Sequence, residues 1–418
     1  MTDRQRSAVS RASSYTAIAQ DVGRSSARTV DPSSSRKKVA LVGHEIRDHG
    51  GMDRAVTELL RRASDQVEFH VISTELSDAL RPLVRWHRLR IPRRPFPLRY
   101  VAFYVVAGIR LLWLRVDVIH TLGAIVPNRV DVATVHACHA GFVRATGALA
   151  PAGAPTLRRI NTAVSRLLSL AAERWTYRPS RVRAVAAVST GVFQELQHHY
   201  PGVRIEITPN GVDSDRFRPD SDVRRGLRQE EGVDPDQYVA LFVGGNWDHK
   251  GLPIVIESIA KGRAMGSPID ELWVVGSGDK ERLRSTAVRH DVADAVKFFG
   301  PRVDVERFYK AADLFVLPSL YEAFSLVLLE AAASGLPIIT TAVHGVDELN
   351  AGRGVLVVDR TAEAVAKAIS DLRADPKRMT RLSQAGRAQA LSYTWASSVE
   401  SILRIYDDLV SESAAITT

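Results

Sequence analysis

The sequence alternates short apolar runs with longer helix-period stretches, from Lys38 to about residue 341. The apolar runs are rich in Val, Ile and Phe and mostly end in Gly, Pro, Ser or Thr, as do the strands of a parallel sheet covered on both faces. They form two series, one from "KVALVG" to "VRIEITPNG" and one from "YVALFVGG" to "LPIITT". This repetition predicts an α/β protein with two doubly wound, Rossmann-like domains.

A length of 418 residues also favours more than one domain. We expect a disordered tail over residues 1–36, because this stretch is rich in Ser, Arg and Ala. The two domains are predicted over residues 37–208 and 209–390, joined near "PNGVDSDRFRPD". Residues 391–418 contain a helix with no strand after it, which we expect to pack back on the N-terminal domain.

Several classes of protein are excluded by what the sequence lacks. Cys138 is the only cysteine, which excludes a disulfide framework and a thiol-based metal site. The longest uncharged apolar run, Tyr100–Ile109, is much shorter than the about 18 residues of a membrane span. The N-terminal stretch lacks the apolar segment of a secretory signal. We therefore expect a cytoplasmic protein.

The positive charge is concentrated in residues 81–115, which hold nine arginines, six aromatic residues and no Asp or Glu. Such a composition suits an anionic membrane surface or nucleic acid. No nucleic-acid-binding motif accompanies the charge, so we expect no nucleic-acid partner and favour peripheral contact with the inner face of the plasma membrane. The alternative is that residues 98–114 form an ordinary core-facing helix whose arginines are solvated.

Two glutamates flank the apolar segment "YEAFSLVLLEAAASGLP". In open parallel sheets, ligands bind beyond the carboxyl ends of the strands, and Glu322 follows the predicted strand "DLFVLPS". The helix predicted over residues 325–334 directs its first free N–H groups back into the same loop, as a phosphate site requires. Glu330, about one and a half turns along, can accept hydrogen bonds from sugar hydroxyls. Alternatively, Glu322 is a helix-end charge and Glu330 faces solvent.

Three further glycine loops follow predicted strands. "FVGGNWDHKG" places Lys250 beside bare backbone, which suits a pyrophosphate. "VVGSGD" adds a turn at Gly276, where a flat base can lie against the backbone, and "HGGMDRA" places Gly50 and Gly51 before a helix. A single glycine pair usually marks only a turn. Four such loops, one with a lysine and one with paired glutamates, predict a functional site.

With these motifs the chain resembles the retaining glycosyltransferases of family 4, which have the GT-B fold. The resemblance covers residues 38 to about 405 and rests on "GGMDR", "VATVHACH", "PNGVDSDRFRP", "FVGGNWDHKG", "VVGSGD", "FFGPRVDVERFYKAADLFVLPSLYEAFSLVLLEAAASGLPIITT" and "GVDEL". The loop around the two glutamates also resembles that of lipopolysaccharide-core glucosyltransferases. The family implies transfer of a sugar from a nucleotide-diphosphate donor to a hydroxyl of a glycan, glycolipid or small molecule, with retention. Because Lys250 and the helix N-terminus at Ser325 can stabilise the leaving diphosphate, we expect neither a metal nor a cofactor.

The resemblance also implies roles for individual residues. Glu322 and Glu330 match the family's E-x7-E motif, in which the first glutamate lies near the donor sugar and the second binds the ribose. Lys250 matches a phosphate-binding lysine, and His136 a histidine that contacts the transferred sugar. The remaining matches concern backbone groups around the donor phosphates: the N–H groups of Phe324, Ser325 and Leu326, and the closing loop of Gly50 and Gly51.

The sequence departs from the family at two places. Gly244 stands six residues before Lys250, where the family often has an arginine, so His249 and Arg302 are the candidates for a second cation. Ala137 follows the histidine where the family often has Asp, and His139 is a rival to His136. We do not interpret "VHACH" as a zinc site, because no further ligand cluster is nearby.

Two other functions remain open. A nucleotide-sugar epimerase or a phosphorylase shares the fold, although no lysine can be assigned to a pyridoxal phosphate cofactor. A non-catalytic scaffold on a membrane would use the arginine-rich stretch, but it would not need Glu322, Glu330 and Lys250. The sequence leaves open the nucleotide base, the sugar, the acceptor and the oligomeric state.

Overall fold

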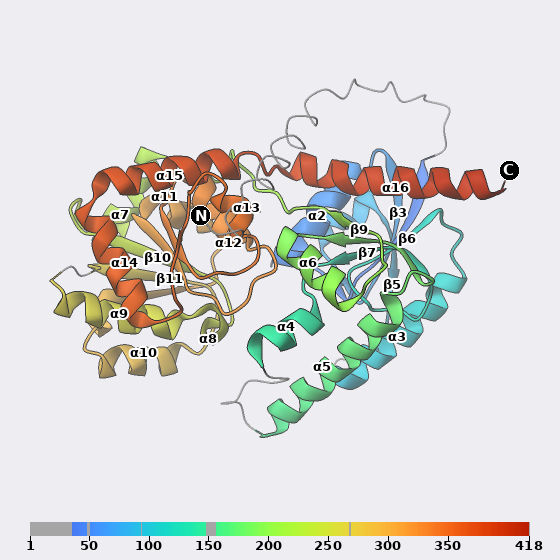
Figure 1. Ribbon diagram of the computed structural model, residues 1–418, viewed down its shortest axis with the longest axis horizontal. Coiled ribbons are helices and arrows are strands. Elements are labelled where there is room, and N and C mark those ends of the chain that lie inside the picture. The colour runs from blue at the N-terminus through green and yellow to red at the C-terminus, as the bar shows by residue number, and fades with distance from the viewer. Residues whose placement is uncertain (1–35, 48–50, 93, 148–155, 267–268, 418) are drawn as a thin grey trace, which may run out of the picture. The chain divides into compact units, whose positions relative to one another are not determined.

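A computed structural model describes residues 36–47, 51–92, 94–147, 156–266 and 269–417. The tail predicted over residues 1–36 lies outside this part of the chain except for its last residue, and Gly50 also lies outside it. The described residues contain two large sheets whose strands are all parallel, each with helices around it (Figure 1). The two predicted Rossmann-like domains are thereby confirmed.

The N-terminal lobe is built on a seven-stranded sheet in the order β5-β3-β1-β6-β7-β8-β9. Its strands are β1 (Lys37–Val42), β3 (Val67–Ser73), β5 (Arg85–Arg88), β6 (Val118–Thr121), β7 (Val130–Val135), β8 (Val182–Ala187) and β9 (Ile205–Ile207), and β2 (Glu45–Ile46) pairs separately with β4 (Glu75–Leu76). Its helices are α2 (Gly51–Ala63), η2 (Asp78–Leu83), α3 (Phe96–Leu112), α4 (His139–Thr146), α5 (Thr156–Thr176) and α6 (Thr190–His199).

The C-terminal lobe is built on a six-stranded sheet in the order β12-β11-β10-β13-β14-β15. Its strands are β10 (Val239–Val243), β11 (Glu271–Val275), β12 (Val296–Gly300), β13 (Leu314–Leu317), β14 (Ile338–Thr340) and β15 (Leu356–Val357). Its helices are α7 (Ser221–Glu230), α8 (Trp247–Lys250), α9 (Leu252–Ala264), α10 (Lys280–Arg289), η3 (Ala293–Ala295), α11 (Val305–Ala311), α12 (Leu326–Ala333), α13 (Val346–Asn350), α14 (Ala362–Ala374) and α15 (Pro376–Ala390).

Both sheets change winding direction at one place. In the first sheet the strands proceed outward from β1 to β5, and the next strand, β6, returns to the other side of β1. In the second sheet β10 and β13 are neighbours in the same way. The connections at such a point leave the sheet in opposite directions, which opens a crevice at the carboxyl ends of the strands. The loops that follow β10 and β13 are therefore the expected binding loops of the second sheet.

The last helix, α16 (Trp395–Thr417), follows the second lobe in sequence but packs on the first (Figure 1). Val399, Ile402 and Leu409 are buried in one apolar cluster with residues of β1, β3 and α2. Tyr406 is fully buried, and its hydroxyl lies 2.5 Å from Nδ1 of His120 at the end of β6. The chain therefore passes between the lobes twice, once after β9 and once before α16.

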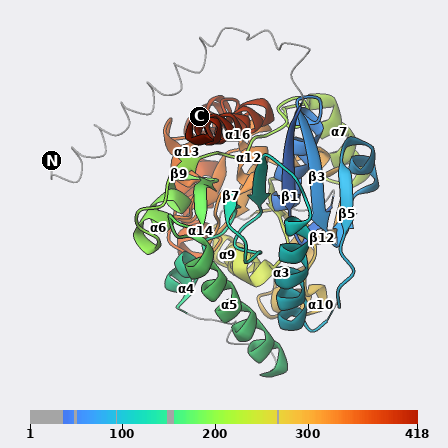
Figure 2. The same cartoon turned by 90° about the vertical axis from the view of Figure 1, so that its right-hand side faces the viewer.

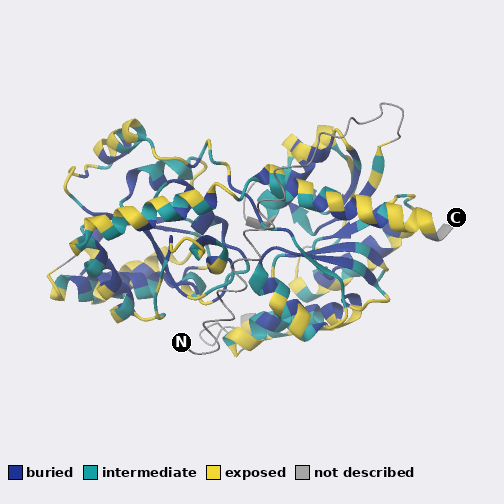
Figure 3. Ribbon diagram, turned by 45° about the horizontal axis from the view of Figure 1, so that its top comes forward, coloured by how far each residue is buried: buried dark blue, intermediate teal, exposed yellow. Residues whose placement is uncertain are grey.

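Helices α3 and α5 pack against each other on one flank of the N-terminal lobe (Figure 2). Burial is concentrated in the strands of both sheets, whereas these helices expose many residues (Figure 3). Strand β5 was not predicted, because the sequence "RWHR" has no apolar alternation; it is an edge strand whose two arginines are exposed. Among the described residues, no helix is both long enough and apolar enough to cross a membrane.

Candidate active site

Lys250 and Glu322 meet where β10 and β13 are adjacent. Lys250 ends the short helix α8 after β10, and Glu322 lies in the loop after β13. Nζ of Lys250 is 2.7 Å from Oε1 of Glu322, and Oγ of Ser319 donates to the same oxygen at 2.7 Å. The lysine and glutamate side chains are only 20% and 14% exposed. Two predicted site residues, 72 positions apart in sequence, thus form an ion pair at the edge of the sheet.

Glycines let Lys250 lie close to the backbone. Gly244 has a φ of +148°, and a Cβ on it would lie 2.6 Å from Cδ of Lys250. Gly276 has a φ of +130°, and a Cβ there would lie 2.0 Å from the carbonyl oxygen of Gly244. The loops after β10 and β11 therefore pack backbone against backbone, and a larger residue at position 244 would displace the lysine stem.

Glu330 is buried in α12, which contradicts the interpretation that it faces solvent. The hydroxyl of Tyr309 donates to Oε2 at 3.0 Å, and Arg54 of α2 forms an ion pair with Oε1. Burial raises the pKa of Glu330, while Arg54 and Tyr309 act in the opposite direction by stabilising the carboxylate. The ion pair joins the two lobes, and the arginine belongs to the motif "GGMDRA".

The N-terminus of α12 opens into the Glu322 loop. Ser325 is its N-cap residue, yet its side chain makes no capping hydrogen bond within the described part of the chain. Leu328 and Leu329 donate their N–H groups to the carbonyl of Ser325 at 3.2 and 3.3 Å, whereas the N–H groups of Leu326 and Val327 have no acceptor within the helix. Two side chains hold the loop before them: Ser189, the N-cap of α6, donates to the carbonyl of Ala323 at 2.6 Å, and Asn210, in the segment between β9 and α7, donates to that of Phe324 at 3.5 Å. The predicted N–H groups of Phe324, Ser325 and Leu326 thus follow Glu322 by two to four residues, in a loop that these contacts fix.

The two candidate histidines occupy different environments. His136 follows β7 directly and, with His120 and Thr134, lines a small cavity of about 30 Å³. Burial lowers its pKa to about 4, so that its imidazole is neutral near pH 7. His139 begins α4, and its Nδ1 lies 3.0 Å from the guanidinium of Arg166. Its pKa is also lowered to about 4, mainly by burial and then by that arginine.

The two candidates for a second cation are engaged elsewhere. Nε2 of His249 lies 2.9 Å from the carbonyl oxygen of Tyr321, and its ring stacks on Phe142 at a centroid distance of 5.6 Å. Arg302 follows β12 and forms two hydrogen bonds of 2.8 Å with the carboxylate of Asp304. Among the described residues, neither side chain is hydrogen-bonded or ion-paired to Lys250 or Glu322. Gly51 is the first residue of α2, three positions before Arg54.

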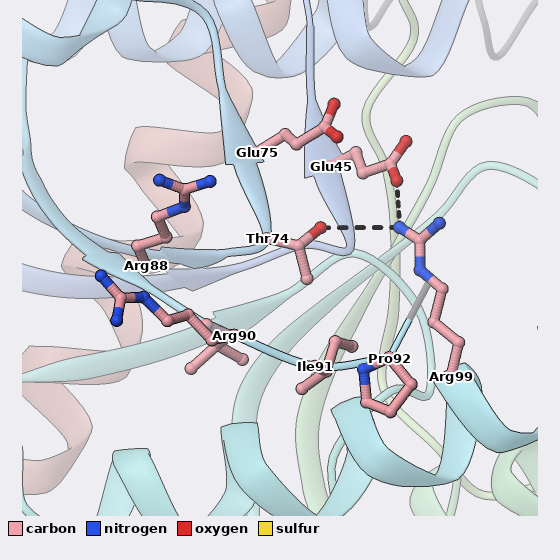
Figure 4. Close-up of a pocket in the computed structure, with 9 residues that line it drawn as sticks. Glu45, Thr74, Glu75, Arg88, Arg90, Ile91, Pro92 and Arg99 are labelled. Carbon is pink, nitrogen blue, oxygen red and sulfur yellow. Dashed lines mark hydrogen bonds and ion pairs between the residues drawn. The ribbon is translucent and has the colours of Figure 1, made fainter. Parts of the chain in front are cut away.

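A pocket of about 360 Å³ lies at the carboxyl edge of the first sheet, between the ends of β3 and β5 and the start of α3 (Figure 4). Arg88 and Arg90 line one side and Arg99 lines the other. Arg99 forms an ion pair with Glu45, whereas Arg88 and Arg90 form no ion pair with any residue that the structure describes. The lining also includes Glu45, Glu75 and apolar side chains, and since both glutamates are paired with arginines, the charges of Arg88 and Arg90 remain uncompensated.

Residues 223–389 match the family model described as glycosyl transferases group 1, and residues 49–216 match the one described as glycosyltransferase family 4. The chain belongs to glycosyltransferase family 4. Its similarity to D-inositol 3-phosphate glycosyltransferases is 34% identity over 212 residues for Segniliparus rotundus and 26% over 399 residues for Streptomyces scabiei. The first match covers 49% of this chain and 46% of that protein, so it spans less than half of either. The second covers 86% of each.

Solved structures show that this glycosyltransferase has the predicted GT-B fold. WaaG, a glycosyltransferase involved in lipopolysaccharide biosynthesis, has a TM-score of 0.72 at 22% identity, covering 87% of this chain and 97% of its own. The sucrose-phosphate synthase of Thermosynechococcus elongatus has a TM-score of 0.71 at 20% identity, covering 90% and 100%. At these identities the likeness concerns the fold alone.

Sequence reasoning about this glycosyltransferase missed three residues around the glutamates. Arg54 and Tyr309 both contact Glu330, and Ser319 contacts Glu322. Ser319 could have been found, because it ends the strand that precedes the glutamate. Arg54 lay within the quoted motif "GGMDR", but its partner is 276 positions away in the other lobe.

Proposed function

We propose that the protein transfers a glycosyl group from a nucleotide-diphosphate sugar to a hydroxyl acceptor, with retention of the anomeric configuration. The observation that carries this proposal is the Lys250–Glu322 ion pair, whose glutamate lies four residues before the first residue of α12. A cation and free N–H groups at this point suit a diphosphate, and the carboxylate beside them suits a sugar.

The donor is bound by groups that remain in place during the reaction. Lys250 and the first-turn N–H groups of α12 bind the diphosphate, and Glu330 accepts hydrogen bonds from the ribose. As the bond between the anomeric carbon and the phosphate oxygen breaks, negative charge develops on the leaving diphosphate. Lys250 and the helix N-terminus stabilise this charge, which lowers the barrier. This arrangement calls for no cofactor and no metal ion.

Retention is explained by attack from the face that the diphosphate leaves. The acceptor oxygen forms its bond to the anomeric carbon while the phosphate bond breaks, and the acceptor proton passes to an oxygen of the leaving phosphate. Glu322 lies beside the transferred sugar, where its negative charge stabilises the positive charge that develops at the anomeric carbon. His136, neutral near pH 7, contacts the same sugar from the other lobe.

Arg54 is the candidate for the second phosphate cation. Both oxygens of Glu330 are occupied in the structure, one by Tyr309 and one by Arg54. A ribose hydroxyl that donates to Oε1 takes the place of Arg54. The guanidinium, 28% exposed, is then free to turn toward the diphosphate, which is bonded to the same ribose. This substitutes for the arginine that the family often has near position 244.

The acceptor binds in the N-terminal lobe and carries an anionic group. The pocket of Arg88, Arg90 and Arg99 lies at the carboxyl edge of the first sheet, where ligands of such sheets bind, and guanidinium groups favour phosphate and carboxylate. The named acceptor of the curated relatives, inositol 3-phosphate, also carries a phosphate. The Anabaena HepE structure in complex with UDP-glucose, with a TM-score of 0.66, makes UDP-glucose the first donor to test.

A donor screen tests the proposal. UDP-, GDP- and ADP-sugars are compared by calorimetry and by slow hydrolysis without acceptor, and the anomeric configuration of the released sugar is followed by NMR. We expect one nucleotide class to bind and the sugar to be released with its configuration retained. A scaffold would bind no donor, an epimerase would change the donor's sugar without release, and a phosphorylase would require inorganic phosphate.

A further inference from the structure

Helix α3 exposes an apolar stripe. Leu98, Val101, Val105, Ile109 and Leu112 recur at intervals of three or four residues, so they share one side of the helix. All five are exposed, and Leu112 and the adjacent Trp113 are each 77% exposed. The opposite side of α3, which includes Phe103 and Leu111, is buried in the core. The helix therefore has an apolar side on the core and a second apolar side in contact with solvent.

Helix α5, which packs against α3, has a matching stripe. Leu157, Ile160, Val164 and Leu167 follow the same spacing, and all are exposed, Leu157 to 83%. We call these four residues, with Leu98, Val101, Val105, Ile109, Leu112 and Trp113, the apolar face. Two neighbouring helices that each expose an apolar stripe are unusual in a soluble monomer, because large exposed apolar surfaces usually bind a partner.

The charge around the apolar face is positive. Arg94, Arg115, Arg159 and Arg174 are exposed beside or on the two helices. Between residues 81 and 172 the sequence holds only two acidic residues, Asp117 and Asp131. Asp117 accepts the backbone N–H of Lys38, and Asp131 accepts that of Ile119 and pairs with Arg183. The one acidic residue on α5, Glu173, is buried.

We propose that the apolar face docks on an anionic bilayer, with α3 and α5 lying in the plane of the interface. An apolar stripe bordered by arginines inserts below the headgroups while the guanidinium groups contact lipid phosphates. A second copy of the chain fits less well, because a symmetric contact would bring the same positive borders together. The pocket of Arg88, Arg90 and Arg99 adjoins the first turn of α3, so docking places it at the lipid surface. The proposal does not depend on the proposed function.

Vesicle co-sedimentation of the full chain tests the proposal. The probe is equimolar phosphatidylcholine and phosphatidylglycerol at low salt, with pure phosphatidylcholine as the comparison. The triple variant Leu112→Ser/Trp113→Ser/Leu157→Ser removes apolar area without adding charge, and we expect at least a tenfold weaker partition coefficient. Binding of the wild type is expected to weaken as salt is raised, because salt screens the arginines.

The matched control is Met265→Ser/Val288→Ser/Val303→Ser, which removes three exposed apolar residues from the C-terminal lobe. We expect it to bind vesicles as the wild type does. Both variants keep the basic residues of 1–36, so equal binding by all three proteins would assign binding to that tail and overturn the proposal. Thermal unfolding checks that the first triple variant is folded. The proposal would also be overturned if the wild type failed to bind these vesicles. The same holds if light scattering showed that the wild type binds no vesicles but forms a dimer that the first triple variant does not form.

Discussion

Lys250 and Glu322 are each other's ion-pair partner, with Nζ 2.7 Å from Oε1, and the pair ties the loop after β10 to the loop after β13. Both side chains are mostly removed from solvent. In such a place, the loss of one partner leaves the other with an uncompensated charge, whereas the loss of both does not. Substitutions at these two positions are therefore expected to be non-additive.

Lys250→Ala is expected to weaken donor binding about 10- to 100-fold, since a charge-assisted contact to the diphosphate contributes roughly 1.5–3 kcal/mol. Titration calorimetry with the nucleotide sugar measures the effect. Lys261→Ala, which removes a half-exposed lysine of α9 that pairs with Glu363, is the control and should bind as the wild type does. Unchanged affinity in a folded Lys250→Ala protein would contradict the phosphate-binding role.

Glu322→Gln and Glu330→Gln should affect different kinetic constants. The ribose is bound equally before and during the reaction, so Glu330→Gln should mainly raise the donor KM. Glu322 acts on charge that develops in the transition state, so Glu322→Gln should mainly lower kcat. The expected rise in the activation barrier is roughly 2–4 kcal/mol. Steady-state kinetics separates the two. A Glu322→Gln enzyme with normal kcat and a raised donor KM would show that this division of roles is wrong.

Arg54→Met is expected to have opposite effects on two ligands. The diphosphate should bind about tenfold more weakly, because a second cation is lost. The nucleoside, which needs only Glu330, should bind more tightly, because the ribose no longer displaces an arginine. Arg54→Lys should restore part of the diphosphate affinity. If both ligands bind more tightly to Arg54→Met, the arginine only occupies Glu330 and does not contact the phosphates.

Glu173 should make the stability depend on pH. Burial raises its pKa from 4.5 to about 7, against the hydrogen bonds from His139 N–H and the Tyr200 hydroxyl. The folded state then holds the proton more tightly than the unfolded state. Glu173 therefore adds roughly 3 kcal/mol to the free energy of unfolding below about pH 4.5. This contribution is lost as the pH rises through about 7.

Thermal unfolding between pH 5 and pH 8 measures this effect. The wild-type Tm should fall with rising pH relative to that of Glu173→Gln, which cannot ionise. Glu257→Gln, on the exposed side of α9, is the control, and its curve should run parallel to that of the wild type. Parallel curves for Glu173→Gln as well would show that Glu173 is charged throughout this range.

Turnover should survive EDTA, because the charge of the leaving diphosphate is expected to be stabilised by Lys250 and the N-terminus of α12. The assay follows release of the nucleoside diphosphate after dialysis against the chelator. Complete loss of activity that Mg²⁺ or Mn²⁺ restores would contradict this expectation.

The fold and the centre of the site were predictable because they depend on local pattern. Apolar runs that end in glycine or proline locate the strands, and parallel topology then brings the loops of Lys250 and Glu322 to the same edge. Strand β5 was not predicted, because it is recognisable as a strand only from its pairing with β3 and not from its composition. Arg302, a predicted phosphate cation, is instead hydrogen-bonded to Asp304, two residues away. The family resemblance does not reveal this local contact.

The contacts between lobes could not be derived from the sequence. The pairing of Arg54 with Glu330 depends on how two independently patterned sheets meet, and no periodicity encodes that arrangement. The same holds for the apolar face: the composition of residues 81–115 suggested a membrane surface, but only the packing of α3 against α5 shows that α5 contributes to it.

Because α16 packs on the first lobe, that lobe lacks part of its core until residues 395–417 have been synthesised. The ribosome releases β1 to β9 first, but Tyr406, which fills the space beside His120, is synthesised only after the whole second lobe. The second lobe can therefore reach its native state during translation while the first waits with an incomplete core. Nascent chains stalled before residue 395 should accordingly leave α2 and the first sheet sensitive to protease.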